Sequence, residues 1–506
     1  MTAVAHTFPS VHIPHPFFES ATAEGASKRL LLVSYAFPPD SAIGALRWQK
    51  LAVFAAQNGW SVDVLMIDPT QSGVRDDSRL VGLPPGVRLF GVHYYSYQES
   101  SMEAVLRKWA SRLLTPLRSR EAARDATNRR AATPAAPMQA VSDANGTGPA
   151  VSPGQVVLAV RRAQLARRSY AEWEDWAARA ATMGIALAEQ RAYDVVVSSG
   201  PPHMAHEAAR EISEGTDTPL VIDLRDPWNH ESYQDPDFQS VAWTRLSEYY
   251  EAKAVARASL VVMNTALAEQ MMRERYPLAA SRITTVMNGA DPELRMPAEW
   301  SSTFVISYAG QIYGGRDPRP LFRGVRRAIE ELGIAPGALE IRFMGSEQSG
   351  GVPLTTLANE SGLGGYFFSE PAQVRSAALA LLQRSAMVVI LPQKYRHSIP
   401  GKVFEYVQAQ AWVLSLADQD SATDLLLRDS CADRFMPDDT EGIAGSVVGH
   451  YREFRAGVRP TPLNADGRFD RTRQAEKLFE AISRAIAHGK STIRPRRFSS
   501  LIERLG

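Results

Sequence analysis

Two kinds of segment alternate along most of the chain. Short runs of apolar, often β-branched residues indicate buried strands of a parallel sheet, because such strands are covered on both faces and show no polar alternation. Between them lie longer segments in which apolar residues recur at helical spacing. The runs that we interpret as strands occupy 29–34, 60–67, 194–199, 219–223, 259–264 and 283–287, and then 304–310, 339–345, 366–368 and 386–391.

This alternation predicts an α/β fold, in which strands and helices connect by right-handed crossovers into doubly wound sheets. The first series of strands ends at a predicted turn, Asn-Gly-Ala-Asp at 288–291, and the second begins at 304. We therefore expect an N-terminal domain over 29–295 and a C-terminal domain over 296–489, with a cleft between them. Helices at 437–455 and 470–488 are expected to end the second domain. Residues 1–28 are expected to be a disordered leader and 490–506 a basic, exposed tail.

An insert at about 98–166 interrupts the first domain. Arginine and lysine alternate with apolar residues over 103–124, which predicts a basic amphipathic helix, and 127–154 is rich in Ala, Pro, Gly and Asn, which predicts a mobile linker. Segment 155–191 is predicted to be helical throughout. Two interpretations of 103–124 stay open: attraction to an anionic membrane surface, or packing on its own domain with the arginines in water.

Composition narrows the class of protein. Of the 506 residues, 45% are apolar and 22% are charged, which is typical of a globular protein of more than one domain. The net charge of +1 provides no overall basic field, so we expect no nucleic-acid partner. The single cysteine, Cys431, rules out an intramolecular disulfide and a multi-cysteine zinc site.

Neither a membrane span nor a signal peptide is expected. No run approaches the roughly 18 to 20 consecutive apolar residues that a spanning helix needs. The first 28 residues lack a positive segment followed by an apolar one. We expect a cytoplasmic protein, located peripherally at the inner face of the membrane if 103–124 binds lipid.

The stretch from His397 to Ala411 carries the clearest chemistry. It follows a predicted strand, and Pro400 and Gly401 open a segment with helical spacing, so a helix is expected to start near Lys402. The N-terminus of a helix attracts an anion through its free N–H groups and its dipole. Glu405, on the first turn, would reach a neutral diol beside that anion. An anion next to a diol suggests a nucleotide sugar.

Several polar residues of the first domain follow predicted strands, where ligands of open α/β sheets gather. Gly44 would let the backbone approach a phosphate, and Arg47 would sit on the first turn of the next helix. Simpler interpretations stay open: Gly44 only permits a turn and Arg47 is solvated. The remaining candidates at strand ends are His203, Arg225 and Asp226, although Asp226 could simply cap the segment before Pro227.

No metal site is expected from the sequence. His203 and His206 are one helical turn apart, but two lone histidines are more often cap or packing residues than metal ligands.

Four pieces of the sequence together resemble a known family. They are 35–39 with Gly44 and Arg47, 199–203 followed by 223–228, 288–291 with 308–310, and 399–406. In order and spacing they resemble the retaining, nucleotide-sugar-dependent glycosyltransferases of family 4, which have the GT-B fold of two Rossmann-like domains. The resemblance covers about 29–488 apart from the insert.

The resemblance implies a role for individual residues. Glu405 would accept hydrogen bonds from the ribose hydroxyls, and Arg316 and Lys402 would hold the diphosphate in place of a metal. Asp226, or Arg225 beside it, stands where many relatives carry a histidine near the reacting sugar. The implied catalytic residues are Arg316, Lys402 and Asp226; the donor-binding ones are Gly44, Gly310, Arg316, Gly345, Phe368, His397, Gly401, Lys402 and Glu405; the acceptor-side ones are Arg47, His203 and Arg225.

One departure from the family concerns the donor sugar. The family pairs two glutamates eight positions apart, but His397 stands eight positions before Glu405. This leaves the sugar open, together with the base, the linkage, the acceptor and the oligomeric state.

The implied function is transfer of a hexose or N-acetylhexosamine, with retention, from a nucleotide diphosphate sugar to a glycan or lipid-linked acceptor, without a cofactor. Such an activity would belong to polysaccharide or glycolipid biosynthesis. Two alternatives stay open: a GT-B nucleotide-sugar epimerase, and a catalytically silent scaffold subunit recruited to the membrane.

Overall fold

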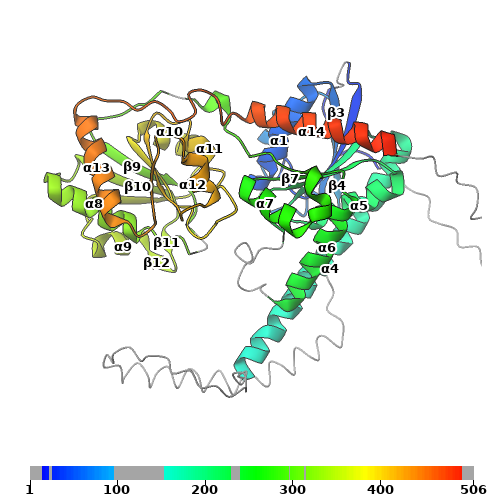
Figure 1. The fold of residues 1–506 in the computed structure, drawn as a ribbon, viewed down its shortest axis with the longest axis horizontal. Helices are drawn as coiled ribbons and strands as arrows, with labels where there is room; N and C mark the ends of the chain where they lie inside the picture. Colours follow the sequence, from blue (N-terminus) through cyan, green and yellow to red (C-terminus); the bar gives the residue numbers. More distant parts are fainter. Residues whose placement is uncertain are drawn as a thin grey trace, which may run out of the picture.

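The structure is a computed structural model that describes residues 14–21, 25–73, 75–95, 153–228, 240–295, 297–312 and 315–492. It contains two α/β units, each built on its own sheet (Figure 1). The expectation of two α/β domains is confirmed. The segment 103–124, predicted to be a basic amphipathic helix, lies outside the described residues, as does the basic tail from 493 onward.

The N-terminal sheet has eight strands in the order β1-β4-β3-β2-β5-β6-β7-β8. All neighbouring pairs are parallel except β1 with β4. The strands are β1 (Phe18–Glu19), β2 (Lys28–Ser34), β3 (Trp60–Ile67), β4 (Val87–Val92), β5 (Val195–Gly200), β6 (Leu220–Leu224), β7 (Leu260–Met263) and β8 (Ile283–Thr285). Its helices are α1 (Ile43–Gln57), α2 (Ser78–Val81), α4 (Pro153–Gln190), α5 (Met204–Thr216), α6 (Val241–Arg257) and α7 (Ala266–Arg275), with 3-10 turns η2 (Pro277–Arg282) and η3 (Pro292–Leu294).

Both faces of this sheet are covered, which explains its continuous apolar strands. Along β2, Leu31 and Val33 belong to the core on one face, whereas Leu30 and Leu32 belong to the core on the other. Successive side chains of a strand point to opposite faces, so a strand buried on both sides must be apolar at every position.

The C-terminal sheet has six parallel strands in the order β13-β10-β9-β14-β15-β16. They are β9 (Phe304–Ala309), β10 (Leu339–Gly345), β13 (Phe367–Pro371), β14 (Met387–Ile390), β15 (Trp412–Leu416) and β16 (Asp433–Phe435), with a small hairpin of β11 (Gln348–Ser349) and β12 (Val352–Pro353). The helices are α8 (Arg319–Leu332), α9 (Leu354–Glu360), α10 (Arg375–Arg384), α11 (Val403–Tyr406), α12 (Ala422–Leu427), α13 (Thr440–Arg455) and α14 (Arg471–Thr492). The sequence pattern did not predict β4, β15 and β16.

The chain passes between the two sheets twice, and the two passages are hydrogen-bonded to each other. The Ala290 N–H donates to the Phe469 carbonyl at 2.6 Å, and the Arg471 N–H donates to the Ala290 carbonyl at 2.7 Å. Gly289 has φ +75°, and a side chain there would lie 2.6 Å from the Arg471 Cα, so only glycine permits this close approach.

The last helix differs from our expectation. We placed 470–488 at the end of the C-terminal domain, but α14 packs on the N-terminal sheet, beside α1 (Figure 1). Ala475, Leu478 and Phe479 lie in the same apolar core as Trp60. The amphipathic pattern showed that this helix has an apolar face but could not show which sheet that face covers.

Two further segments bear on the predictions. Phe18 and Glu19 pair with β4, so the expectation of a disordered leader is wrong for this part of 1–28. The helix predicted over 155–191 is confirmed as α4, whose N-terminal half extends away from the sheet (Figure 1). Within the described part of the chain, no helix is long and apolar enough to cross a membrane.

Candidate functional site

Two glycines line the carboxyl ends of the central strands of the C-terminal sheet. Gly310, after β9, has φ +133°, and Gly345, at the end of β10, has φ +117°. A side chain at Gly345 would lie 3.0 Å from the Gly310 carbonyl group, and a side chain at Gly310 would lie 2.2 Å from the Lys402 Nζ. Glycine is therefore required at both positions, and its absence of a side chain lets the Lys402 ammonium approach the backbone of the β9 loop.

The Lys402 ammonium lies over the ring of Tyr308, 4.0 Å from its centroid, and donates a 2.8 Å hydrogen bond to the Tyr308 hydroxyl. Burial and, to a smaller extent, the charge of Arg316 lower the pKa of Lys402, and the charge of Glu405 partly offsets them, so that this pKa is about 7. Arg316 is itself buried, with its guanidinium over the ring of Tyr395. Two cations held close together in a buried place favour a polyvalent anion between them.

The loop that carries Arg316 is held by side-chain hydrogen bonds. Gln393 accepts from the Asp317 N–H at 2.7 Å and donates to the Asp317 carbonyl at 3.0 Å. The Gln311 amide donates to the Gly345 carbonyl at 2.7 Å, and the Ser349 hydroxyl donates to the Arg316 carbonyl at 3.1 Å. These bonds join the loops after β9, β10 and β14, so Arg316 occupies a defined position.

Glu405 lies on α11, one turn after Lys402, and makes an ion pair with Arg375. The Arg375 Nη2 and Nε both donate to Glu405 Oε1, at 2.8 and 3.1 Å. The negative charge of Glu405 raises the pKa of Lys402, against the effect of burial. The structure thus brings together Gly310, Arg316, Gly345, Lys402 and Glu405 at one end of the sheet.

Three other predicted donor residues differ in their surroundings. Phe368 pairs in register with Arg342, three residues before Gly345, so it lies near the start of the edge strand β13 and not at the carboxyl ends of the strands, with the Arg342 guanidinium over its ring. Gly401 is exposed, and a side chain there would meet nothing within 4 Å, so no close approach requires glycine. His397 follows β14, and its carbonyl accepts a 2.6 Å hydrogen bond from the Thr265 hydroxyl.

The Thr265 contact connects the two sheets at their carboxyl ends. Thr265 lies two residues after the end of β7 and caps α7, with its hydroxyl accepting from the Ala268 N–H at 3.1 Å. The same hydroxyl donates to the loop after β14. The loops at the carboxyl end of one sheet therefore touch those of the other, as expected for a ligand site shared between them.

In the N-terminal domain, Arg225 joins the loops that follow β2 and β5. Its guanidinium is buried and donates to the carbonyls of Gly44, Gly200 and Pro201. A side chain at Gly44 would lie 2.3 Å from Arg225 Nη1, which explains the glycine. Burial lowers the pKa of Arg225. Arg225 is accordingly a residue that shapes these loops, and its three carbonyl contacts leave it little capacity to bind an acceptor.

Asp226 is the residue directly after Arg225, and its carboxyl group is also buried. Burial raises the pKa of Asp226, while the charge of Arg225 partly offsets this. No hydrogen bond joins its side chain to the rest of the described chain. A carboxylate of raised pKa at the end of β6 is a candidate to contact a substrate hydroxyl.

His203 and His206 form a stacked cluster with Trp228. The His203 and Trp228 rings are 5.1 Å apart at 19°, and the His206 Nδ1 is 2.8 Å from the Ser198 hydroxyl. Burial lowers the pKa of His203 well below its ordinary value and that of His206 to about 3. Both rings are therefore neutral at physiological pH. Across the described ranges, no group of three or more His, Cys, Asp or Glu side chains could hold a metal ion.

Arg47 corrects one prediction. We expected it on the acceptor side, but its side chain is 4% exposed and pairs with Asp223, with Nε–Oδ2 and Nη2–Oδ1 distances of 2.9 Å. It also donates to the carbonyls of Val286 and Met287 at 3.0 Å. Because its donors are used inside the domain, Arg47 is a structural residue.

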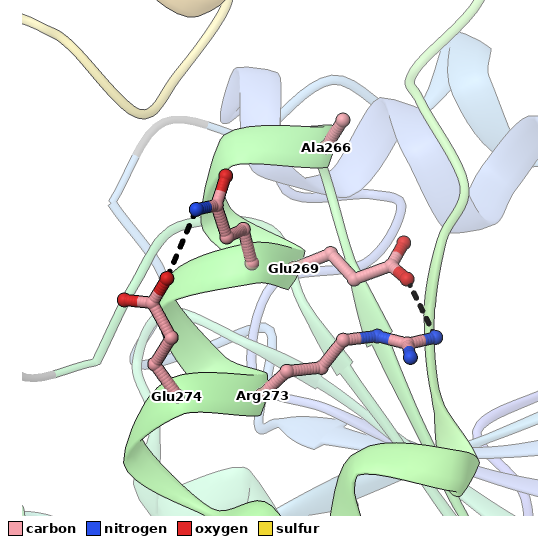
Figure 2. A pocket seen from close by; sticks show the side chains of 5 residues that line it. Ala266, Glu269, Arg273 and Glu274 are labelled. Carbon is pink, nitrogen blue, oxygen red and sulfur yellow. Dashed lines mark hydrogen bonds and ion pairs between the residues drawn. The ribbon is translucent and has the colours of Figure 1, made fainter.

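A shallow groove of about 590 Å³ lies along α7 (Figure 2). Its charged side chains are paired within the helix: Arg273 with Glu269 at 2.8 Å, and Gln270 with Glu274 at 2.9 Å. Glu269 also accepts from the Thr285 hydroxyl at 2.6 Å. This internal pairing leaves little for a ligand, so the groove is not the candidate site.

Residues 142–294 match the model of Glycosyltransferase Family 4, from within the insert to the end of the N-terminal domain. No curated protein matches the sequence.

Solved structures match over nearly the whole chain at low identity. A UDP-forming α,α-trehalose-phosphate synthase from Burkholderia xenovorans is 12% identical, with 90% of this chain and 99% of that one covered and a TM-score of 0.53. The HepE protein of Anabaena, solved with UDP and glucose, is 12% identical, with 90% and 99% covered and a TM-score of 0.50. A glycosyltransferase from Rickettsia africae is 10% identical, with 93% and 99% covered and a TM-score of 0.50.

The fold is GT-B. The match to the family model and the fold together support a GT-B glycosyltransferase.

Sequence reasoning missed three residues that complete the candidate site. Tyr308 holds Lys402, and Arg375 holds Glu405. Tyr406 is fully buried, and its hydroxyl accepts from the Ala309 N–H at 2.7 Å, which fixes α11 to the end of β9. Tyr308 and Tyr406 fall inside the quoted motifs and could have been examined, whereas Arg375 is about 30 positions from Glu405 in an ordinary helical pattern and gave no signal.

Proposed function

We propose that this protein is a retaining glycosyltransferase that moves a hexose or N-acetylhexosamine from a nucleotide diphosphate sugar to a glycan or lipid-linked acceptor. The observation that carries the proposal is the pair of cations, buried Arg316 and half-buried Lys402, beside the glycine-lined ends of β9 and β10. Glu405 supports it, because a carboxylate next to a diphosphate site can accept from a ribose diol. That the HepE structure contains UDP also fits a nucleotide sugar as donor.

The proposed mechanism uses the donor itself as the base. The acceptor oxygen forms a bond to the anomeric carbon on the face from which the diphosphate departs, so configuration is retained. The bond from the anomeric carbon to the phosphate oxygen breaks with its electron pair going to that oxygen, which takes the acceptor's proton. Arg316 and Lys402 stabilise the charge that develops on the departing diphosphate, so neither a metal nor another cofactor is needed. Asp226 would orient the acceptor hydroxyl.

The first test is binding, measured as a thermal shift with UDP, GDP, ADP and their sugars. A ligand at 100 times its dissociation constant adds about 2.7 kcal/mol to stability. No shift with any of them would count against the enzyme. The second test is transfer from the best-binding donor to a lipid extract, with the anomeric configuration of the product determined by NMR; an inverted product would exclude the retaining mechanism.

The cations are tested by substitution. Arg316→Met and Lys402→Met are each expected to lower the rate of transfer at least tenfold, since each removes a charge that stabilises the departing diphosphate. In comparable sites the loss of one such stabilising group lowers kcat by about 10²–10³. The matched control is Arg326→Met on α8, whose side chain pairs with Glu330 at 2.7 Å away from the site. Release of an isomerised or free sugar without an acceptor would instead indicate the epimerase, and binding without turnover the silent subunit.

A further inference from the structure

Glu405 is held from one side only. Arg375, the first residue of α10, donates to Glu405 Oε1 with two nitrogens, Nη2 at 2.8 Å and Nε at 3.1 Å. No described residue donates to Oε2. One oxygen of the carboxylate is therefore occupied within the protein, and the other retains its full capacity to accept hydrogen bonds.

The Arg375 nitrogen that lies nearer to Glu405, Nη2, also forms an ion pair with Asp291. This nitrogen lies 3.5 Å from Asp291 Oδ2, and the Asp291 side chain is only 3% exposed. Asp291 belongs to the first passage between the domains and is fixed there by Arg471 and, at 3.8 Å, by Lys50. Nη2 of Arg375 is therefore shared between the buried carboxylate of Asp291 and that of Glu405, which is 28% exposed.

An otherwise unrestrained glutamate on a helix surface samples several side-chain conformations, and a ligand that needs one of them must bear the cost of ordering it. A planar guanidinium that binds through two nitrogens restricts the carboxylate more strongly than a single ammonium would. Arg375 thus selects one arrangement of Glu405 before any ligand binds.

We infer that Arg375 is a positioning residue for recognition of the nucleotide ribose: it holds Glu405 Oε1 so that Oε2 accepts from the ribose hydroxyls. This inference rests on the proposed function, because it takes Glu405 to face the nucleotide. It assigns Arg375 no contact with the substrate, and it predicts an effect on the ribose and none on the diphosphate.

The test compares ribonucleotides with their 2′-deoxy counterparts. The dissociation constants of UDP, GDP and ADP, of dUDP, dGDP and dADP, and of pyrophosphate are measured by calorimetry for the wild type and the variants. In the wild type the best ribonucleotide should bind about tenfold more tightly than its deoxy form, the effect of one hydrogen bond to a charged group. In Arg375→Met this ratio should fall to within about twofold, while pyrophosphate binds as in the wild type.

Two further variants sharpen the result. Arg375→Lys keeps the charge but not the fork, so its ratio should lie between those of the wild type and Arg375→Met. Arg384→Met is the matched control: Arg384 is exposed in the last turn of the same helix, where its Nε donates to the Ala380 carbonyl at 3.3 Å, and the ratio should not change.

The outcomes separate this inference from the proposed function. Retention of the wild-type ratio in Arg375→Met overturns the inference, and so does an equal loss of ribonucleotide, deoxynucleotide and pyrophosphate, which would make Arg375 a phosphate ligand. A wild type that binds nucleotides without discriminating the 2′-hydroxyl also overturns it but leaves the diphosphate site standing. A wild type that binds no nucleotide contradicts the proposed function itself.

Discussion

Substitution of Arg47 distinguishes two roles of this residue. The sequence predicts that Arg47 lies on the acceptor side, whereas its buried pair with Asp223 indicates a structural role. In the structure Asp223 is fully buried and accepts four hydrogen bonds, two from Arg47, one from Trp48 at 2.8 Å and one from Ser199 at 3.2 Å. Arg47→Met removes two of these and leaves the carboxylate buried without its charge partner. Breaking a buried pair in this way costs about 3–5 kcal/mol. Because domains are stable by only about 5–15 kcal/mol, the loss should be obvious.

The assay is urea unfolding followed by circular dichroism and tryptophan fluorescence. Lys50→Met is the matched control, since Lys50 lies on the same helix and its 2.6 Å pair with Glu293 is partly exposed; its loss should cost no more than about 1 kcal/mol. Replacing both partners, in Arg47→Met with Asp223→Leu, should recover part of the stability, because no buried charge is then left unpaired. A loss below about 1 kcal/mol for Arg47→Met would refute the structural role. Normal stability with abolished transfer would instead restore the acceptor-side role.

The same pair has a consequence for pH dependence. Burial raises the pKa of Asp223, but the charge and hydrogen bonds of Arg47 lower it below its ordinary value. A carboxylate with a lowered folded pKa contributes stability that is present above its unfolded pKa and is lost as pH falls through the folded one. The difference in stability between wild type and Arg47→Met should therefore narrow as pH falls below about 4.

Three further predictions concern the C-terminal domain. Gly310→Ala should lower transfer at least tenfold, because its side chain would lie 2.2 Å from Lys402 Nζ; a loss of this size is seen when one charge-stabilising group is displaced. The control is Gly445→Ala, in an exposed part of α13 where a side chain would meet nothing within 4 Å. This variant should retain activity and gain up to about 1 kcal/mol of stability. Affinity for UDP should fall as pH rises through about 7, the pKa of Lys402, since only the ammonium attracts the diphosphate. Calorimetry in buffers of different ionisation enthalpy should detect proton uptake on binding. An affinity that does not depend on pH would contradict this role of Lys402. Burial alone would lower the pKa of His450, but its bonds to Asp433 and Glu453, both 2.7 Å, raise it. The wild type should therefore exceed His450→Gln in stability by roughly 1–2 kcal/mol below pH 6 and lose that advantage as pH rises through the folded pKa. An advantage that persists at pH 9 would show that His450 does not stabilise the protein through its charge.

By itself the sequence determined the local structure and the chemistry of the motif that carries Lys402 and Glu405. Apolar runs that are buried on both faces and helices with one apolar stripe are written in adjacent residues, so the two α/β units, their order and the helix at 155–191 could be predicted. Strand β16 and the pairing of β1 lack such a signal, because two or three residues in a sheet are stabilised mainly by their neighbours. Strand β15 does have a buried apolar run, which we did not interpret as a strand.

Only the tertiary structure decided which partner each side chain meets. Arg47 and Arg225 both follow strands. Arg47 nevertheless forms a buried pair with Asp223, 176 positions away, whereas Arg225 donates to the carbonyls of Gly44, Gly200 and Pro201. The docking of α14 on the opposite domain and the ion pairs of Arg375 with Glu405 and Asp291 likewise depend on residues distant in the chain. Periodicity encodes which face of an element is buried, but the burial and charge that give a residue its role come from segments that folding brings beside it.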